Sequence, residues 1–294
     1  MIDQPINMRQ GLDVDFDKFL SHSKNLLLAF SNSGISINTS CRFSVFINKM
    51  ENFIKAISKS DILIKGEEIA LLAEGIRDFF EMNVIAKSER IRYDGKKDLQ
   101  KLFSGSSFPS GDSLQTPRSL QFQLYLAALM DLSGFDIKLK EPDFFFQYKG
   151  HKYSVAAKRI NSPSKIYARL SEAKKQIKNY DDLGFIAFSI DRIVWDEMNR
   201  DTYIITKNPD VLYSAGETIF YDVLRNKFKR AVLDNLDPQV VGHIVSLTVP
   251  ALIPELYSIG VSHTLKFIPF VEPDNIIYED TKEMSQKMKW PSYT

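Results

Sequence analysis

The chain has 294 residues, of which 44% are hydrophobic, which is enough to bury one large core or two modest ones. Its 38 Lys and Arg residues nearly balance 37 Asp and Glu residues, so the net charge of +1 excludes a strongly basic protein and any nucleic-acid surface must be local. The single cysteine, Cys41, excludes an intramolecular disulfide and a cysteine-rich zinc site, and we expect a soluble, cytoplasmic protein without a signal peptide or membrane span.

Helical periodicity runs through the first third of the sequence. Apolar residues recur at helix-like spacing in three segments, at 16–30, 43–57 and 67–82. A stretch rich in Ser, Gly and Pro at 104–112 then predicts a loop or linker. We therefore expect a helical N-terminal region, residues 1–110, that recognises a substrate or partner, and a second domain at residues 111–294.

The second domain is predicted to follow the order helix, three strands, helix, strand. Thr116 and Pro117 are typical of a helix start, and Gly134 is typical of its end. The further elements predicted are strands at 135–139, 143–148 and 152–160, a helix at 163–180, a strand at 184–190, a helix at 216–236, and strands at 240–249 and 262–270. The charges at 282–289 around Trp290 predict a solvated tail, and the alternative is a basic and aromatic contact with nucleic acid. This order predicts an α/β (α+β) fold.

Side-chain alternation separates two faces of the strand at 152–160. Ala156 and Lys158 share one face, and the neighbouring residues Val155 and Ala157 share the apolar face that we expect to meet the core. Asp143, on the preceding strand, lies on the side of Lys158 if the hairpin register allows it. The alternative is that Asp143 only forms a turn and that Lys158 is a solvated strand end.

The helix predicted at 163–180 has two distinct faces. Its core face carries Ile166, Leu170, Ala173 and Ile177, and its adjacent polar face carries Lys165, Arg169, Glu172, Gln176 and Tyr180. We expect Lys165 and Arg169 to contact phosphates and Gln176 to form a hydrogen bond near a metal ion. The alternative is an ordinary solvated face.

Together these residues resemble the PD-(D/E)XK nuclease superfamily, which includes restriction endonucleases and RecB-like exonucleases. Pro142-Asp143 matches the "PD" element, and Ala156-Ala157-Lys158 stands in the place of "(D/E)-x-K". The segment from Gln176 to Tyr180 matches the Q-x-x-x-Y element of RecB-like members, and Gln123 stands where the first helix usually carries a glutamate. The resemblance covers roughly residues 116 to 190.

The resemblance implies a restriction-endonuclease-like αβββαβ core with a central mixed sheet. It implies a metal-dependent nuclease that cleaves phosphodiester bonds, with DNA as the expected substrate and restriction or anti-phage defence as the expected setting. Asp143 and the backbone carbonyl of Ala157 are then expected to bind Mg²⁺ or Mn²⁺, and Lys158 to orient the attacking water or stabilise charge on the phosphate. The supporting groups are expected to be Gln176 and Gln123, and the nucleic-acid contacts Lys165, Arg169, Tyr180 and Arg159. A separate ATPase or helicase, or a second copy of the chain, is the expected protein partner.

The alanine at position 156 removes the second acid of this motif. Asp143 and a carbonyl alone are few ligands for a hard cation that prefers several oxygens, so we expect weak metal binding and weak or absent cleavage. Glu141 lies about 7 Å from Asp143 along the strand and is a poor substitute. Three explanations remain open: an engineered Glu→Ala or Asp→Ala substitution, natural loss that leaves a non-catalytic nucleic-acid-binding or assembly subunit, and a fortuitous resemblance.

Overall fold

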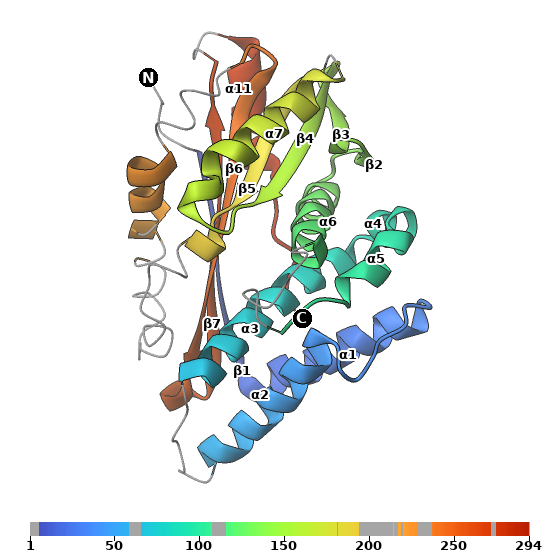
Figure 1. The fold of residues 1–294 in the computed structure, drawn as a ribbon, viewed down its shortest axis with the longest axis vertical. Helices are drawn as coiled ribbons and strands as arrows, with labels where there is room; N and C mark the ends of the chain where they lie inside the picture. Colours follow the sequence, from blue (N-terminus) through green and yellow to red (C-terminus); the bar gives the residue numbers. More distant parts are fainter. Residues whose placement is uncertain are drawn as a thin grey trace.

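A seven-stranded mixed sheet forms the centre of an α/β fold, with the strand order β1-β7-β6-β5-β4-β3-β2 (Figure 1). The structure is a computed structural model that describes residues 6–58, 66–107, 116–180, 182–193, 214, 217–218, 220–228, 237–271 and 275–293. Its strands are β1 (Ile6–Asp15), β2 (Lys138–Lys140), β3 (Asp143–Tyr148), β4 (His151–Arg159), β5 (Leu183–Ser189), β6 (Val240–Ile253) and β7 (Ser258–Pro269). Strands β4, β5 and β6 run parallel, and the remaining neighbours are antiparallel.

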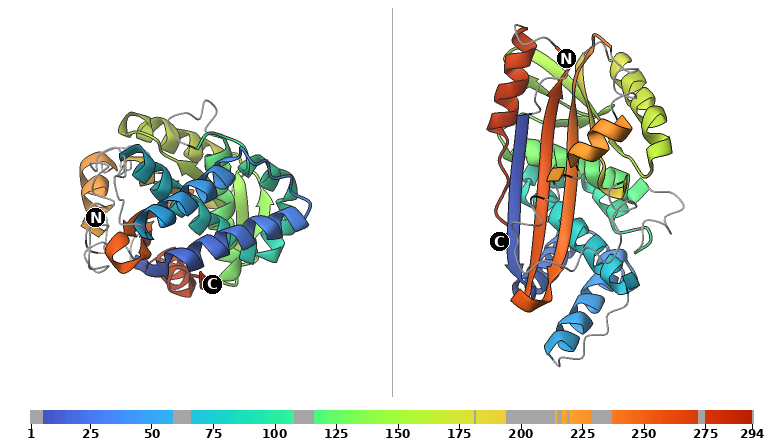
Figure 2. Two further views of the ribbon diagram at one scale, coloured as in Figure 1. Left: turned by 90° about the horizontal axis from the view of Figure 1, so that it is seen from below. Right: turned by 90° about the vertical axis from the view of Figure 1, so that its left-hand side faces the viewer.

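The prediction that the N-terminal region is entirely helical is wrong in one respect, because the first described residues form β1. This strand pairs antiparallel with β7 over its whole length, from Ile6 opposite Phe267 to Asp15 opposite Ser258. Figure 2 shows β1, β7 and β6 as long strands side by side. The sequence carries a partial signal, since Ile6, Met8, Leu12 and Val14 occupy alternate positions, with Gln10 as the one polar residue in that series. The N-terminal region is therefore joined to the same sheet as the second domain.

Helices cover both faces of the sheet. They are α1 (Phe16–Asn32), α2 (Arg42–Ser58), α3 (Gly66–Lys87), α4 (Glu89–Asp94), α5 (Lys96–Leu102), α6 (Thr116–Leu132), α7 (Ile166–Lys178) and α11 (Ile276–Lys287). The tail predicted at 282–289 lies mostly in α11, where the charged side chains of Lys287 and Lys289 are exposed as expected but Met284 is buried against the sheet, so the segment is packed on one side. Of the helix predicted at 216–236, residues 217–218 and 220–228 are described and helical, and 216, 219 and 229–236 lie outside the described residues. In the parts of the chain that the structure describes, no helix is long and apolar enough to cross a membrane.

The two faces of β4 belong to two different hydrophobic cores. Val155 and Ala157 point into the larger core with α6, which also contains residues of α1, α2 and α3. Ala156 points into the second core, where it meets the apolar face of α7, including Leu170 and Ala173. Because the larger core contains residues from both sides of position 110, the expected boundary does not separate two cores.

Buried charges tie the N-terminal helices to the end of β4. The guanidinium of Arg42 on α2 donates a hydrogen bond of 2.9 Å to Asp78 on α3. Arg118, on α6, lies 3.6 Å from the same carboxylate. On the neighbouring turn of α3, Glu81 accepts a hydrogen bond of 2.5 Å from Arg159 at the end of β4. All five side chains are almost fully buried, so this charge cluster fixes the position of the strand end that carries Lys158.

Candidate functional site

Asp143 begins β3 directly after a two-residue turn. The backbone ladder between β3 and β4 ends at Phe144, and one step further the Oδ2 atom of Asp143 accepts a hydrogen bond of 2.6 Å from the backbone N–H of Ala157. The register sets Asp143 across from Ala156. Because residues that face each other across a ladder lie on the same side of a sheet, the prediction that Asp143 and Lys158 share one face is confirmed.

The carboxyl group of Asp143 titrates near neutrality. Burial raises its pKa from 3.8 to about 7, although Lys158 and the Ala157 N–H act in the opposite direction. The nearby carboxylates of Glu141 and Glu172 raise the pKa further. Functional acids and metal ligands are often found in such an environment, where a carboxyl group is buried beside both a cation and other carboxylates.

Lys158 pairs with a second carboxylate, that of Glu172 on α7. The Nζ atom of Lys158 is 3.3 Å from Oε1 of Glu172, and the lysine side chain is only 10% exposed. Glu172 also accepts a hydrogen bond of 2.8 Å from Arg169. Burial would raise the pKa of Glu172, but Arg169 and Lys158 outweigh it and lower that pKa below its usual value. Glu172 is therefore ionised at neutral pH.

Ala156 leaves room for this approach of α7. Its side chain is fully buried and packs against the helix face that carries Leu170 and Ala173. The acid that is absent from β4 is thus matched by one on the helix that covers β4. Glu172 was predicted on a polar face next to Arg169 but not as a ligand, because the motif places its second acid on a strand.

Four groups on or next to the contact between β4 and α7 carry oxygen atoms that a metal ion can bind. The carboxylates are those of Asp143 and Glu172, and the backbone carbonyl of Ala157 is adjacent to the lysine in the chain. The side-chain oxygen of Gln176 is buried and has no hydrogen-bond partner among the described residues. It lies one helical turn from Glu172, so both project from the same face of α7. Within the described chain no three His, Cys, Asp or Glu side chains group as metal ligands. However, Mg²⁺ is usually held by only one or two carboxylates together with water, so these residues fit such an ion.

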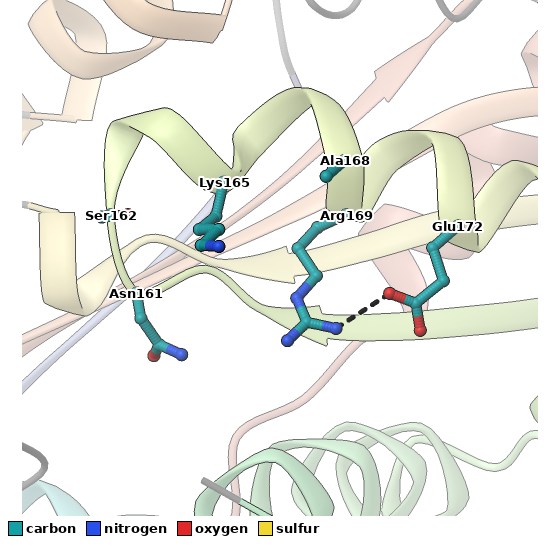
Figure 3. Close-up of a pocket in the computed structure, with 6 residues that line it drawn as sticks. All are labelled: Asn161, Ser162, Lys165, Ala168, Arg169 and Glu172. Atoms are coloured by element: carbon teal, nitrogen blue, oxygen red, sulfur yellow. Dashed lines mark hydrogen bonds and ion pairs between the residues drawn. The ribbon is translucent and has the colours of Figure 1, made fainter. Parts of the chain in front are cut away.

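A pocket of about 370 Å³ opens beside Glu172 at the start of α7. Its lining residues are Asn161, Ser162, Lys165, Ala168, Arg169 and Glu172. Figure 3 shows Arg169 and Glu172 of α7 and Lys165, which directly precedes α7, projecting toward one side, with Asn161 of the preceding loop to their left. The two residues predicted to contact phosphates, Lys165 and Arg169, therefore lie together at the edge of the carboxylate pair.

Three predicted site residues lie apart from this group. Arg159 points to the opposite face of β4, is 3% exposed and pairs with Glu81, so its predicted contact with nucleic acid is wrong for this structure. Gln123 lies on α6, across β4 from α7, and no hydrogen bond in the described chain joins it to Asp143 or Lys158. Tyr180 is 37% exposed and follows the far end of α7, two turns beyond Glu172.

Comparisons of the chain with protein-family models, with curated proteins and with solved structures give no match. The residues around Lys158 are therefore the features of this chain that bear on its function. Their arrangement joins two carboxylates, one ammonium group and a basic pocket within one end of the sheet.

The raised pKa of Asp143 predicts a pH-dependent effect of Asp143→Asn on stability. An acid whose pKa rises on folding destabilises the fold increasingly between its unfolded pKa, near 4, and its folded pKa, near 7. We expect the melting temperature of Asp143→Asn to match the wild type at pH 4 and to exceed it by about 5 °C at pH 8, measured by thermal denaturation in EDTA. Excess Mg²⁺ at pH 8 should stabilise only the wild type. An equal difference at both pH values would contradict a titration of Asp143.

Proposed function

We propose that the protein is a metal-dependent nuclease of PD-(D/E)XK type in which Glu172 supplies the second carboxylate. The observation that carries the proposal is the position of Lys158, with Glu172 at 3.3 Å and Asp143 close enough for its pKa to respond to both groups. The order α6, β2, β3, β4, α7, β5 is compatible with the restriction-endonuclease-like core that the resemblance implies. DNA as the substrate, and a setting in restriction or anti-phage defence, enter this proposal through the resemblance alone.

Asp143, Glu172 and the carbonyl of Ala157 would hold Mg²⁺ or Mn²⁺, with the amide oxygen of Gln176 as a further donor. When bound, such an ion lowers the pKa of a water molecule and stabilises the negative charge on a phosphate. The water oxygen forms a new bond to phosphorus while a P–O ester bond breaks, so one strand end receives the phosphate and the other a hydroxyl group.

The side chains of this chain have separate tasks in that reaction. The ammonium group of Lys158 stabilises the charge that develops on the reacting phosphate, and its low exposure strengthens the interaction. Lys165 and Arg169 hold a neighbouring phosphate in the pocket at the start of α7. Arg169 also fixes the carboxylate of Glu172 through its 2.8 Å hydrogen bond.

The test is cleavage of supercoiled plasmid and of single-stranded DNA with Mg²⁺, with Mn²⁺ and with EDTA. We expect the wild-type protein to cut with either metal, and Ala156→Glu to cut no faster, because position 156 is fully buried beneath α7 and Glu172 already provides the acid.

A buried glutamate at position 156 should also lower the melting temperature by roughly 5–10 °C, and Ala156→Gln separates the effect of volume from that of charge. A large gain of cleavage in Ala156→Glu would assign the site to position 156 and not to Glu172. Nucleic-acid binding without cleavage in both proteins would favour the non-catalytic subunit.

A further inference from the structure

The side of the sheet that carries Asp143 continues onto an open, basic face of β2, β3 and β4. Backbone register sets Lys140 opposite Asp143 and Lys138 opposite Phe145, so all four share one side of the sheet. Lys152, on β4, lies diagonally across from Phe145 on the same side. The three lysines are exposed and Phe145 is half-buried. On this side α7 packs on β4 and β5, and among the described residues Lys138 and Lys140 of β2 remain exposed.

This lysine platform, made of Lys138, Lys140, Phe145 and Lys152, interleaves cations with an aromatic ring. The ammonium of Lys152 lies 4.7 Å from the centre of the Phe145 ring, and that of Lys138 lies 6.0 Å from it. Lys152 also pairs with Asp182 at 2.8 Å, whereas Lys138 and Lys140 have no ion pair with any described residue. Lysine stems that shield a half-buried ring would explain Lys138 and Lys152, but not Lys140, which lies opposite Asp143.

We propose that the lysine platform binds single-stranded nucleic acid and leads it to the carboxylates at Lys158; this rests on the proposed function and names its substrate class. Lys138 and Lys140 are about 7 Å apart along β2, a separation that two successive phosphates of an extended strand can match. The ring of Phe145 lies between the lysines, where a base can stack on it. Stacking on a ring needs an unpaired base, so Phe145 favours a single strand over a duplex.

A base and a lysine ammonium would compete for the Phe145 ring, and this competition favours the base. A base that stacks on an aromatic ring gains more free energy than an exposed ammonium over the same ring, so the base displaces the lysine. The displaced ammonium then neutralises a phosphate and releases its counterions. The platform also lies across the carboxylate pair from the pocket of Lys165 and Arg169, so a strand held by both surfaces passes over Asp143 and Glu172.

The test measures binding in the absence of cleavage. The full-length protein carrying Glu172→Gln is titrated in EDTA against a short fluorescent single strand and against its duplex, over a range of salt concentrations. Adding Lys138→Gln and Lys140→Gln should weaken single-strand binding about tenfold at low salt and reduce the slope of log K against log salt by about 1.4, which is 0.7 for each phosphate. Adding Phe145→Ala should weaken single-strand binding about tenfold and barely change duplex binding. The matched control is Lys96→Gln with Lys97→Gln on α5, which removes the same charge from an exposed site and should leave binding unchanged.

The outcomes separate this inference from the proposed function. Single-strand binding that depends on Lys138, Lys140 and Phe145, in a protein whose wild type cuts nothing, would support the platform and overturn the nuclease. Cleavage by the wild type, with binding that none of these changes affects, would overturn the platform alone. The proposal for the lysine platform would be overturned if the protein did not bind the single strand or bound the duplex more tightly. It would also be overturned if polyaspartate, which has charge but no bases, competed equally well. All three positions are at least partly exposed, and melting temperatures equal to that of the parent confirm that the variants are folded.

Discussion

Glu172→Gln is expected to reduce the rate of phosphodiester cleavage roughly 10²- to 10³-fold. The change keeps the size of the side chain but removes the negative charge that faces Lys158 at 3.3 Å. In this variant α7 no longer supplies a carboxylate, and Asp143 of β3 remains. A divalent cation therefore binds more weakly, and the charge on the phosphate is less well stabilised. The measurement is the initial rate of plasmid cleavage as a function of Mn²⁺ and Mg²⁺ concentration. The metal concentration that gives half of the maximal rate should rise, and high Mn²⁺ should restore part of the rate.

The matched control is Glu279→Gln on α11. Glu279 is 48% exposed and pairs with Lys282 three residues later at 3.5 Å, much as Glu172 is 46% exposed and pairs with Arg169 three residues earlier. Its replacement should leave both the cleavage rate and the metal dependence unchanged, because surface pairs of this kind contribute little. Wild-type cleavage in Glu172→Gln, with normal metal dependence, would show that the second carboxylate is not Glu172.

The position of Glu172 explains why the sequence predicted only half of the carboxylate pair. Alternation along two strands is enough to place Asp143 and Lys158 on one face, because a hairpin has a short-range register. Whether a helix residue reaches that face depends on how closely the helix packs, and here the small side chain of Ala156, in the same core as the apolar face of α7, permits the approach. Such packing is a property of the folded chain, and spacing within the sequence does not encode it.

Two other errors have different origins. Arg159 follows Lys158 directly, so strand alternation by itself assigns it to the opposite face, and the prediction that it binds nucleic acid overlooked this rule. The pairing of β1 with β7 could not be predicted, because it joins residues such as Ile6 and Phe267 that are far apart in the chain, and no local signal specifies the partner of an edge strand.

Asp78→Asn is expected to cause the largest loss of stability of any single change considered, about 3–5 kcal/mol. Burial alone would raise the pKa of Asp78, but Arg42, Arg118 and their neighbours outweigh it and hold that pKa at about 2. The carboxylate lies 2.9 Å from Arg42 and 3.6 Å from Arg118. Asparagine leaves these buried guanidinium groups without that negative charge, so the melting temperature at pH 7 should fall by roughly 10 °C.

The pH dependence identifies the origin of that loss. Since the pKa of Asp78 is lower in the folded than in the unfolded chain, its contribution is complete above pH 4 and disappears as the pH falls toward 2. The difference in unfolding free energy between wild type and Asp78→Asn should therefore shrink over the same range. Asp98→Asn is the control, because Asp98 forms a 2.6 Å ion pair with Lys101 at the surface, and its loss should barely change the melting temperature. If the two substitutions had equal, small effects, other groups than Asp78 would neutralise the charge of the buried arginines. The charge cluster would then not be what holds the end of β4, and with it Lys158, in place.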